Sequence, residues 1–168
     1  MTYFEIFGSP VRLKMTPAEL SVRFFALSRE FHPDFHAQAD EVTRQEMLEK
    51  SAMLNKAWKT FQSPDETIKY VLQLKGLLEE EEKYQLAPDF LMEVMEINEA
   101  LMDPEEADRE ALGKRINSLQ LEIYEPVQQV VENYQEGITT EKELLQVKAW
   151  YYQKKYLDRI KQQLAGMA

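Results

Sequence analysis

The fold is decided by residues 20–35, which read LSVRFFALSREFHPDF. The large apolar side chains recur every three or four residues, and they are Leu20, Phe24, Leu27 and Phe31. This spacing is typical of an amphipathic helix with one face in a core. Pro33 disfavours helical backbone at the residue before it, so the helix is expected to end at Phe31. The segment therefore predicts a helix followed by a stiff turn that carries His32 and Asp34.

Helix start signals recur outward from this stretch. A capping residue followed by Pro, with Glu at the third helical position, occurs at Thr16–Glu19, Ser63–Glu66 and Asp103–Glu106, and Pro88 marks a looser start. Helices are predicted over 3–7, 16–31, 39–62, 64–75, 89–102, 104–135 and 140–165. Only five glycines occur, and no segment has the pattern of a strand. The predicted fold class is all-α.

The helix over 39–62 is expected to pair with the helix over 16–31 in an antiparallel hairpin, with residues 31–35 at its tip. Its predicted core face comprises Val42, Leu48, Ala52, Leu54, Ala57, Trp58 and Phe61. Pro126 conflicts with the helix over 104–135, because proline removes a helical hydrogen bond and clashes with the preceding turn. The helix is either kinked at Glu122–Glu125 or split. We favour a kink, since Val127, Val130, Val131 and Tyr134 continue the apolar spacing.

Charge divides the chain unevenly. Residues 1–75 carry ten Lys/Arg and ten Asp/Glu, so the whole net charge of −10 lies in residues 76–168. Gly76 and the acidic run Glu79–Glu82 indicate a boundary, which predicts domains over 1–75 and 88–168 joined by a linker over 76–87. The acidic surplus disfavours binding to nucleic acid and to anionic membranes.

Cysteine is absent, which excludes disulfides, thiolate metal sites and a cysteine nucleophile. The N-terminal residues Met1–Glu5 have no signal-peptide or transit-peptide pattern, and no apolar run approaches the roughly 20 residues of a membrane span. A cytoplasmic protein without a cofactor or bound metal is expected.

Two places are candidates for function. His32-Pro33-Asp34 is open to three interpretations: a helix stop, a catalytic or metal site with His36, or a recognition tip for a protein partner.

The second candidate lies in residues 90–102. The side chains of Phe90, Val94, Ile97 and Leu101 form a predicted core stripe there. A second apolar face comprises Leu91, Met92, Met95 and Met102, bordered by Glu96, Glu99 and Asp103. Either this helix is buried on two sides, or the second face is exposed and suits a protein partner. The later helices should complete a three-helix bundle through Leu112, Ile116, Leu119, Ile123 and Val130, and through Leu144, Val147, Tyr151, Leu157, Ile160 and Leu164.

These residues resemble a known family. Tyr3–Gly8, then Leu20–Phe31, then His32-Pro33-Asp34, and finally Leu54–Phe61 before Ser63-Pro64 are similar to the J-domain, and the whole chain looks most like the HscB (Jac) co-chaperones of iron–sulfur cluster assembly. The resemblance implies a J-domain hairpin and a C-terminal three-helix bundle in an L-shaped arrangement. It also implies a non-enzymatic protein that stimulates a DnaK/HscA-class ATPase and delivers an IscU-type scaffold protein to it.

The resemblance assigns roles to particular residues. His32, Pro33 and Asp34 would dock on the ATPase, with Asp34 pairing with an arginine there, and Arg23 and Arg29 would give a modest basic face. The scaffold would bind Leu91, Met92, Met95, Glu96, Glu99, Asp103 and Tyr152. The chain departs from many J-domains at Phe35 and at Phe25-Ala26, where those have basic residues. A structural helical interaction protein, or a J-protein with a different client, is the alternative.

Overall fold

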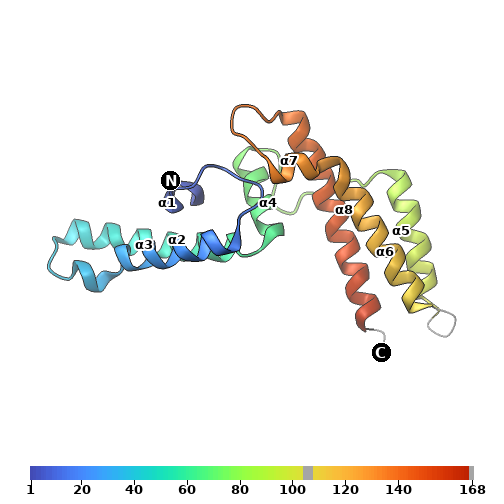
Figure 1. Cartoon of the computed structure of the whole chain (residues 1–168), viewed down its shortest axis with the longest axis horizontal. Coiled ribbons are helices and arrows are strands. Elements are labelled where there is room, and N and C mark those ends of the chain that lie inside the picture. Colours follow the sequence, from blue (N-terminus) through green and yellow to red (C-terminus); the bar gives the residue numbers. More distant parts are fainter. Residues whose placement is uncertain (104–107, 167–168) are drawn as a thin grey trace. The chain divides into compact units, whose positions relative to one another are not determined.

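The computed structural model describes residues 1–103 and 108–166, and these are helical with no strand (Figure 1). The all-α prediction is confirmed. The chain divides into two compact units. The first comprises Met1–Leu74 and Glu132–Ile138, and the second comprises Lys75–Val131 and the chain from Thr139 onward.

The first unit is built on an antiparallel pair of helices, α2 (Pro17–Phe31) and α3 (Glu41–Phe61), which lie side by side (Figure 1). A short helix α1 (Tyr3–Phe7) precedes them and α4 (Pro64–Leu74) follows. Each start and end lies within two residues of the sequence prediction. Phe4 and Phe7 from α1 pack against Phe61, with ring centroids 4.8 and 5.5 Å away. The N–H of Tyr3 donates to the hydroxyl of Tyr70 at 3.0 Å, which fastens α1 to α4.

The predicted core face of α3 was wrong over its first half. Leu54, Ala57 and Phe61 are buried, but Val42, Leu48 and Ala52 are exposed. The face of α3 that carries Leu54 continues toward the N-terminus at intervals of three or four residues. The residues at these positions are Lys50, Met47 and Thr43, which are half-buried. The Lys50 ammonium group lies 5.7 Å from the centroid of the Phe31 ring, so a lysine stem covers the core where an apolar side chain was expected.

The second unit contains α5 (Pro88–Leu101), α6 (Arg109–Tyr124) and α8 (Glu141–Gly166), which pack together (Figure 1). Their shared core consists of Phe90, Val94, Ile97, Leu112, Ile116, Leu119, Leu157 and Ile160, with Leu101, Ile123 and Leu164 packed against it. The predicted core stripe of α5 is confirmed. The helix start predicted over Asp103–Glu106 includes Pro104, Glu105 and Glu106, which lie outside the described residues. Helix α6 begins at Arg109, where the Asp108 carboxylate accepts the N–H of Ala111.

Pro126 interrupts the long helix by one 3-10 turn, Glu125–Val127, and α7 (Gln128–Glu132) continues from it. The backbone stays in the right-handed helical region at Tyr124, Glu125 and Gln128. The local change is therefore in the hydrogen-bond pattern: the N–H of Gln128 donates to the carbonyl of Glu125, three residues back. Val127 and Val131 are both buried, so the apolar spacing continues across the proline as expected.

Candidate functional site

The turn after α2 projects a carboxylate from a stiff loop. His32 leaves the helix with extended backbone, φ −62° and ψ 131°, and Pro33–His36 form a single 3-10 turn. His32 Nδ1 accepts the backbone N–H of Asp34 at 3.2 Å. The same nitrogen lies 3.6 Å from Asp34 Oδ2, so the imidazole adjoins both the backbone and the carboxylate of Asp34. The Asp34 side chain is 88% exposed.

The second histidine of the loop is used to hold it. His36 Nε2 lies 2.8 Å from the carbonyl of Glu30, and since a carbonyl can only accept, His36 donates. This bond ties the end of the 3-10 turn back to α2. Phe35, between the two, is exposed and lies edge-on to His32. In the part of the chain that the structure describes, no group of three or more His, Asp or Glu residues could hold a metal ion.

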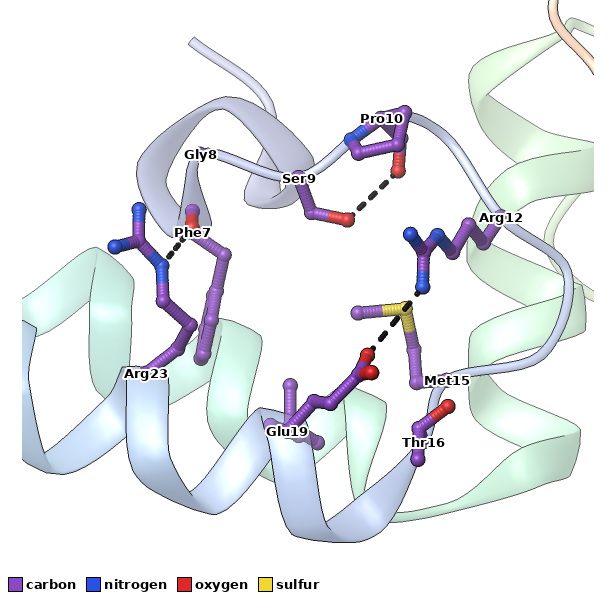
Figure 2. Close-up of a pocket in the computed structure, with 10 residues that line it drawn as sticks. Phe7, Gly8, Ser9, Pro10, Arg12, Met15, Thr16, Glu19 and Arg23 are labelled. Atoms are coloured by element: carbon purple, nitrogen blue, oxygen red, sulfur yellow. Dashed lines mark hydrogen bonds and ion pairs between the residues drawn. The ribbon is translucent and has the colours of Figure 1, made fainter.

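The two arginines predicted beside the loop differ in their surroundings. Arg29 is exposed and lies within a turn of the loop. Arg23 is six residues earlier, which is about 9 Å farther along the helix axis. Its Nε donates to the carbonyl of Phe7 at 3.0 Å (Figure 2). Arg23 therefore secures the turn after α1, and Arg29 is the one of the two that lies near the loop.

Arg23 also borders a small cavity of about 160 Å³ at the start of α2 (Figure 2). Phe7, Met15 and Leu20 are among its apolar lining residues. The charged lining is already paired, because Arg12 lies 3.6 Å from Glu19 across the opening. The cavity adds no unpaired charge to the first unit's candidate site.

The second face of α5 is open to solvent. Met92 is 64% exposed and Met95 59%, and Met102 is also exposed, whereas Leu91 is half-buried. The two methionines are therefore not buried against a neighbouring helix. Glu99 and Asp103 are exposed at the border. Glu96 is engaged, since its carboxylate accepts from Arg115 Nη2 on α6 at 2.6 Å.

Tyr152 lies on α8 in a setting that the sequence did not indicate. Its ring is half-buried and stacks on Tyr84, with centroids 4.6 Å apart and planes 4° from parallel. Burial raises the pKa of Tyr152, and the charge of Glu82 adds to the effect. Glu82 in turn accepts from Lys148 at 2.6 Å, and this hydrogen bond lowers the pKa of the Glu82 carboxyl. The sequence alone did not single out Tyr84 or Lys148. The signal that could have indicated Tyr84 is an aromatic residue directly after the acidic run Glu79–Glu82.

Comparison with known proteins gives a consistent result. The model of the HSCB C-terminal oligomerisation domain matches residues 86–165. A co-chaperone protein HscB homolog of Vibrio cholerae is 38% identical over an alignment of 114 residues that covers 64% of this chain and 67% of the relative. Chaperone HscB from Vibrio cholerae has a similar structure, with a TM-score of 0.67 at 26% identity over 98% of this chain and 96% of that one. The crystal structure of human co-chaperone protein HscB gives a TM-score of 0.73 at 26% identity, over 98% of this chain and 81% of that one.

The fold and these relatives define a helical co-chaperone, a class of protein that performs no catalysis of its own. The chain belongs to the HscB co-chaperone family. Across the helices that the structure describes, none is long and apolar enough to cross a membrane.

Proposed function

We propose that this protein stimulates the ATPase of a DnaK/HscA-class chaperone and delivers an IscU-type iron–sulfur scaffold protein to it. In this proposal residues 1–75 form the J-domain that docks on the ATPase, residues 76–87 form the linker, and residues 88–168 bind the scaffold. The observation that carries the first part is the Asp34 carboxylate, which is exposed on a loop whose shape is fixed by two hydrogen bonds, one accepted by His32 and one donated by His36.

The loop is suited to binding because little of it has to be ordered on docking. Pro33 fixes one backbone dihedral, His32 caps the 3-10 turn and His36 ties its end to α2. A carboxylate held in this way forms a charge-assisted hydrogen bond with an arginine of the ATPase at a low entropic cost. Arg29 would add one cation near the loop, so the electrostatic part of docking should be small.

The exposed face of α5 supports the second part. Met92 and Met95 present flexible, polarizable side chains to solvent, and Glu99 and Asp103 border them. Large exposed apolar side chains with a charged rim are a common composition for a protein interface. The net charge of −10 in residues 76–168 would favour a scaffold with a basic surface.

The ATPase proposal is tested by steady-state ATP hydrolysis. Adding this protein to its DnaK/HscA-class partner should raise turnover, and Asp34→Asn should abolish the increase while far-UV circular dichroism stays unchanged. Glu66→Gln, which removes an exposed carboxylate from the first turn of α4, beyond the end of α3 that is remote from the loop, is the matched control and should stimulate normally. If no DnaK-class protein of the same cell responds, the co-chaperone mechanism proposed for this chain is refuted.

The scaffold proposal is tested by calorimetry with the purified scaffold. Met92→Ala with Met95→Ala should weaken binding about tenfold or more, in the range of interface anchor residues. Val42→Ala with Leu48→Ala, which truncates two exposed apolar side chains of α3, is the control and should leave the affinity unchanged. Equal losses in both double variants would show that the effect is not specific to α5, and would favour a different client surface.

A further inference from the structure

The segment between α4 and α5 is fastened to α8 by four side chains, which we call the clasp: Glu82, Tyr84, Lys148 and Tyr152. Lys148 Nζ lies 2.6 Å from Glu82 Oε2, and the side chains are only 14% and 20% exposed. Tyr84 stacks on Tyr152 in the parallel arrangement described above. The Lys148 ammonium group also lies 5.7 Å from the Tyr84 ring centroid, so the charged pair and the aromatic pair adjoin each other.

The distance between Glu82 and Tyr84 along their segment matches the distance between Lys148 and Tyr152 along α8. Glu82 and Tyr84 are two residues apart in a segment without helix, and two extended residues span about 6.6 Å. Lys148 and Tyr152 are four residues apart on α8, which separates them by about 6 Å along the axis on one face. Each residue of the first pair therefore meets one residue of the second. An acidic stretch expected to be a solvated linker is held at a fixed register against a helix.

The carboxylate of the clasp is held at both oxygens. Oε2 accepts from Lys148, and Oε1 accepts the backbone N–H of Glu79 at 3.1 Å. Glu81, between them, has left-handed backbone with φ 55°, which is uncommon for a residue other than glycine. Glu79–Glu82 therefore close into a turn, the Glu82 carboxylate of that turn accepts from Lys148, and Tyr84, two residues later, stacks on Tyr152.

We infer that the clasp fixes the orientation of the Tyr152 ring for the scaffold protein, which makes Tyr84 a positioning residue of the scaffold site. This inference rests on the proposed function. One face of the Tyr152 ring is stacked on Tyr84, and Tyr151 lies edge-on to the ring at 5.1 Å. The remaining ring surface is held in one place before a partner arrives, so ordering it on binding costs little entropy.

The clasp also connects Tyr152 to the start of α5. Leu86, two residues after Tyr84, packs against the core cluster that contains Phe90 and Val94. Residues 82–86 are thus anchored at both ends, by the clasp at one end and by the core at the other. Releasing the clasp should loosen the chain that leads into α5, as well as the Tyr152 ring.

The test compares Tyr84→Ala with Tyr84→Phe, which keeps the stacked ring and removes only the hydroxyl. Calorimetry with the IscU-type scaffold should show about three- to tenfold weaker binding for Tyr84→Ala and unchanged binding for Tyr84→Phe. Phenol absorbance against pH, with a Tyr152→Phe chain subtracted, should show the raised pKa of Tyr152 returning further toward its ordinary value in Tyr84→Ala than in Tyr84→Phe. Both variants remove the charge of the Tyr84 phenol, but only Tyr84→Ala also removes the ring that buries Tyr152. A merely structural role would not give this paired result.

The outcomes separate the inference from the function on which it rests. If Tyr84→Ala shifts the pKa of Tyr152 but binds the scaffold like the wild type, the clasp exists and the positioning role is refuted. If Tyr84→Ala leaves that pKa unchanged, the clasp itself is refuted. If the wild-type chain does not bind the scaffold at all, the scaffold proposal fails together with the positioning role, whatever the titration shows.

Discussion

Replacing Ile97 and Met95 with alanine, one at a time, should separate stability from partner binding on the two faces of α5. Ile97 has no exposed surface and lies in the core with Val94, Ile116 and Leu157, each at most 1% exposed. Met95 is two residues away on the same helix and points to solvent, with 59% of its surface exposed. A buried and an exposed side chain of the same helix can therefore be truncated and compared.

The expected losses of stability differ by several-fold. Truncating a buried isoleucine to alanine costs roughly 2–5 kcal/mol, and more where the surroundings cannot collapse into the cavity. Since the neighbours of Ile97 are themselves fully packed, a loss of about 4 kcal/mol is expected. Burying a whole methionine side chain is worth about 1.5–3 kcal/mol, and Met95 is less than half buried, so its truncation should cost about 1 kcal/mol or less.

Urea denaturation followed by circular dichroism measures both losses. With a slope of about 2 kcal/mol per molar urea, Ile97→Ala should lower the midpoint by about 2 M, and Met95→Ala by no more than about 0.5 M. In scaffold binding under native conditions the order should reverse, with Met95→Ala weakened and folded Ile97→Ala close to wild type. Equal destabilisation by the two variants would refute the assignment of Met95 to an exposed face.

Three further predictions concern stability. Gly8→Ala should lower the melting temperature more than Gly137→Ala. Both glycines have positive φ, +64° and +79°, but of the two only Gly8 has a neighbour that a Cβ would meet, Arg23 Nη2 at 2.5 Å, and the guanidinium that has to move is the one whose Nε donates to the Phe7 carbonyl. Thr67→Val should cost about 1 kcal/mol in urea denaturation, because the buried hydroxyl donates to the carbonyl of Ser63 at 2.9 Å, and an unchanged midpoint would show that this bond contributes nothing. Because the folded pKa of Glu82 is lowered, its contribution to stability is present above the unfolded value of about 4.5 and is lost as pH falls through the folded value. As the pH falls from about 4.5 to the onset of acid unfolding, the free energy of unfolding should therefore decrease less in Lys148→Met than in the wild type. If the free energies of unfolding of the two chains depend on pH in parallel, the pairing of Glu82 with Lys148 is contradicted.

The local order of the chain could be predicted because its signals act over a few residues. Pro17, Pro64 and Pro88 each stand at the first position of a helix, and Gly8 ends α1 in left-handed backbone. Likewise, Pro33 stops α2 and places Asp34 on the turn that follows. Backbone sterics and capping decide these features with no help from the rest of the fold.

Side-chain environment was harder to predict, because it depends on which helix lies opposite. Val42, Leu48 and Ala52 are apolar but lie off the face of α3 that meets α2, and Lys50 lies over the Phe31 ring. The arginine predicted to serve docking, Arg23, donates to a carbonyl sixteen residues away. Apolar composition alone could not decide these positions, since a residue's burial is set by the phase of its helix relative to its neighbour.

The sequence by itself determined an all-α chain, the helix ends of the first unit, the His32-Pro33-Asp34 turn and the two-faced character of α5. Only the tertiary structure decided that Glu96 pairs with Arg115, that Arg23 secures the end of α1, and that Tyr84 stacks on Tyr152. The physical reason is the distance along the chain. Caps and periodicity act within one or two turns, whereas Tyr84 and Tyr152 are brought together only when α8 packs against the segment that leads into α5.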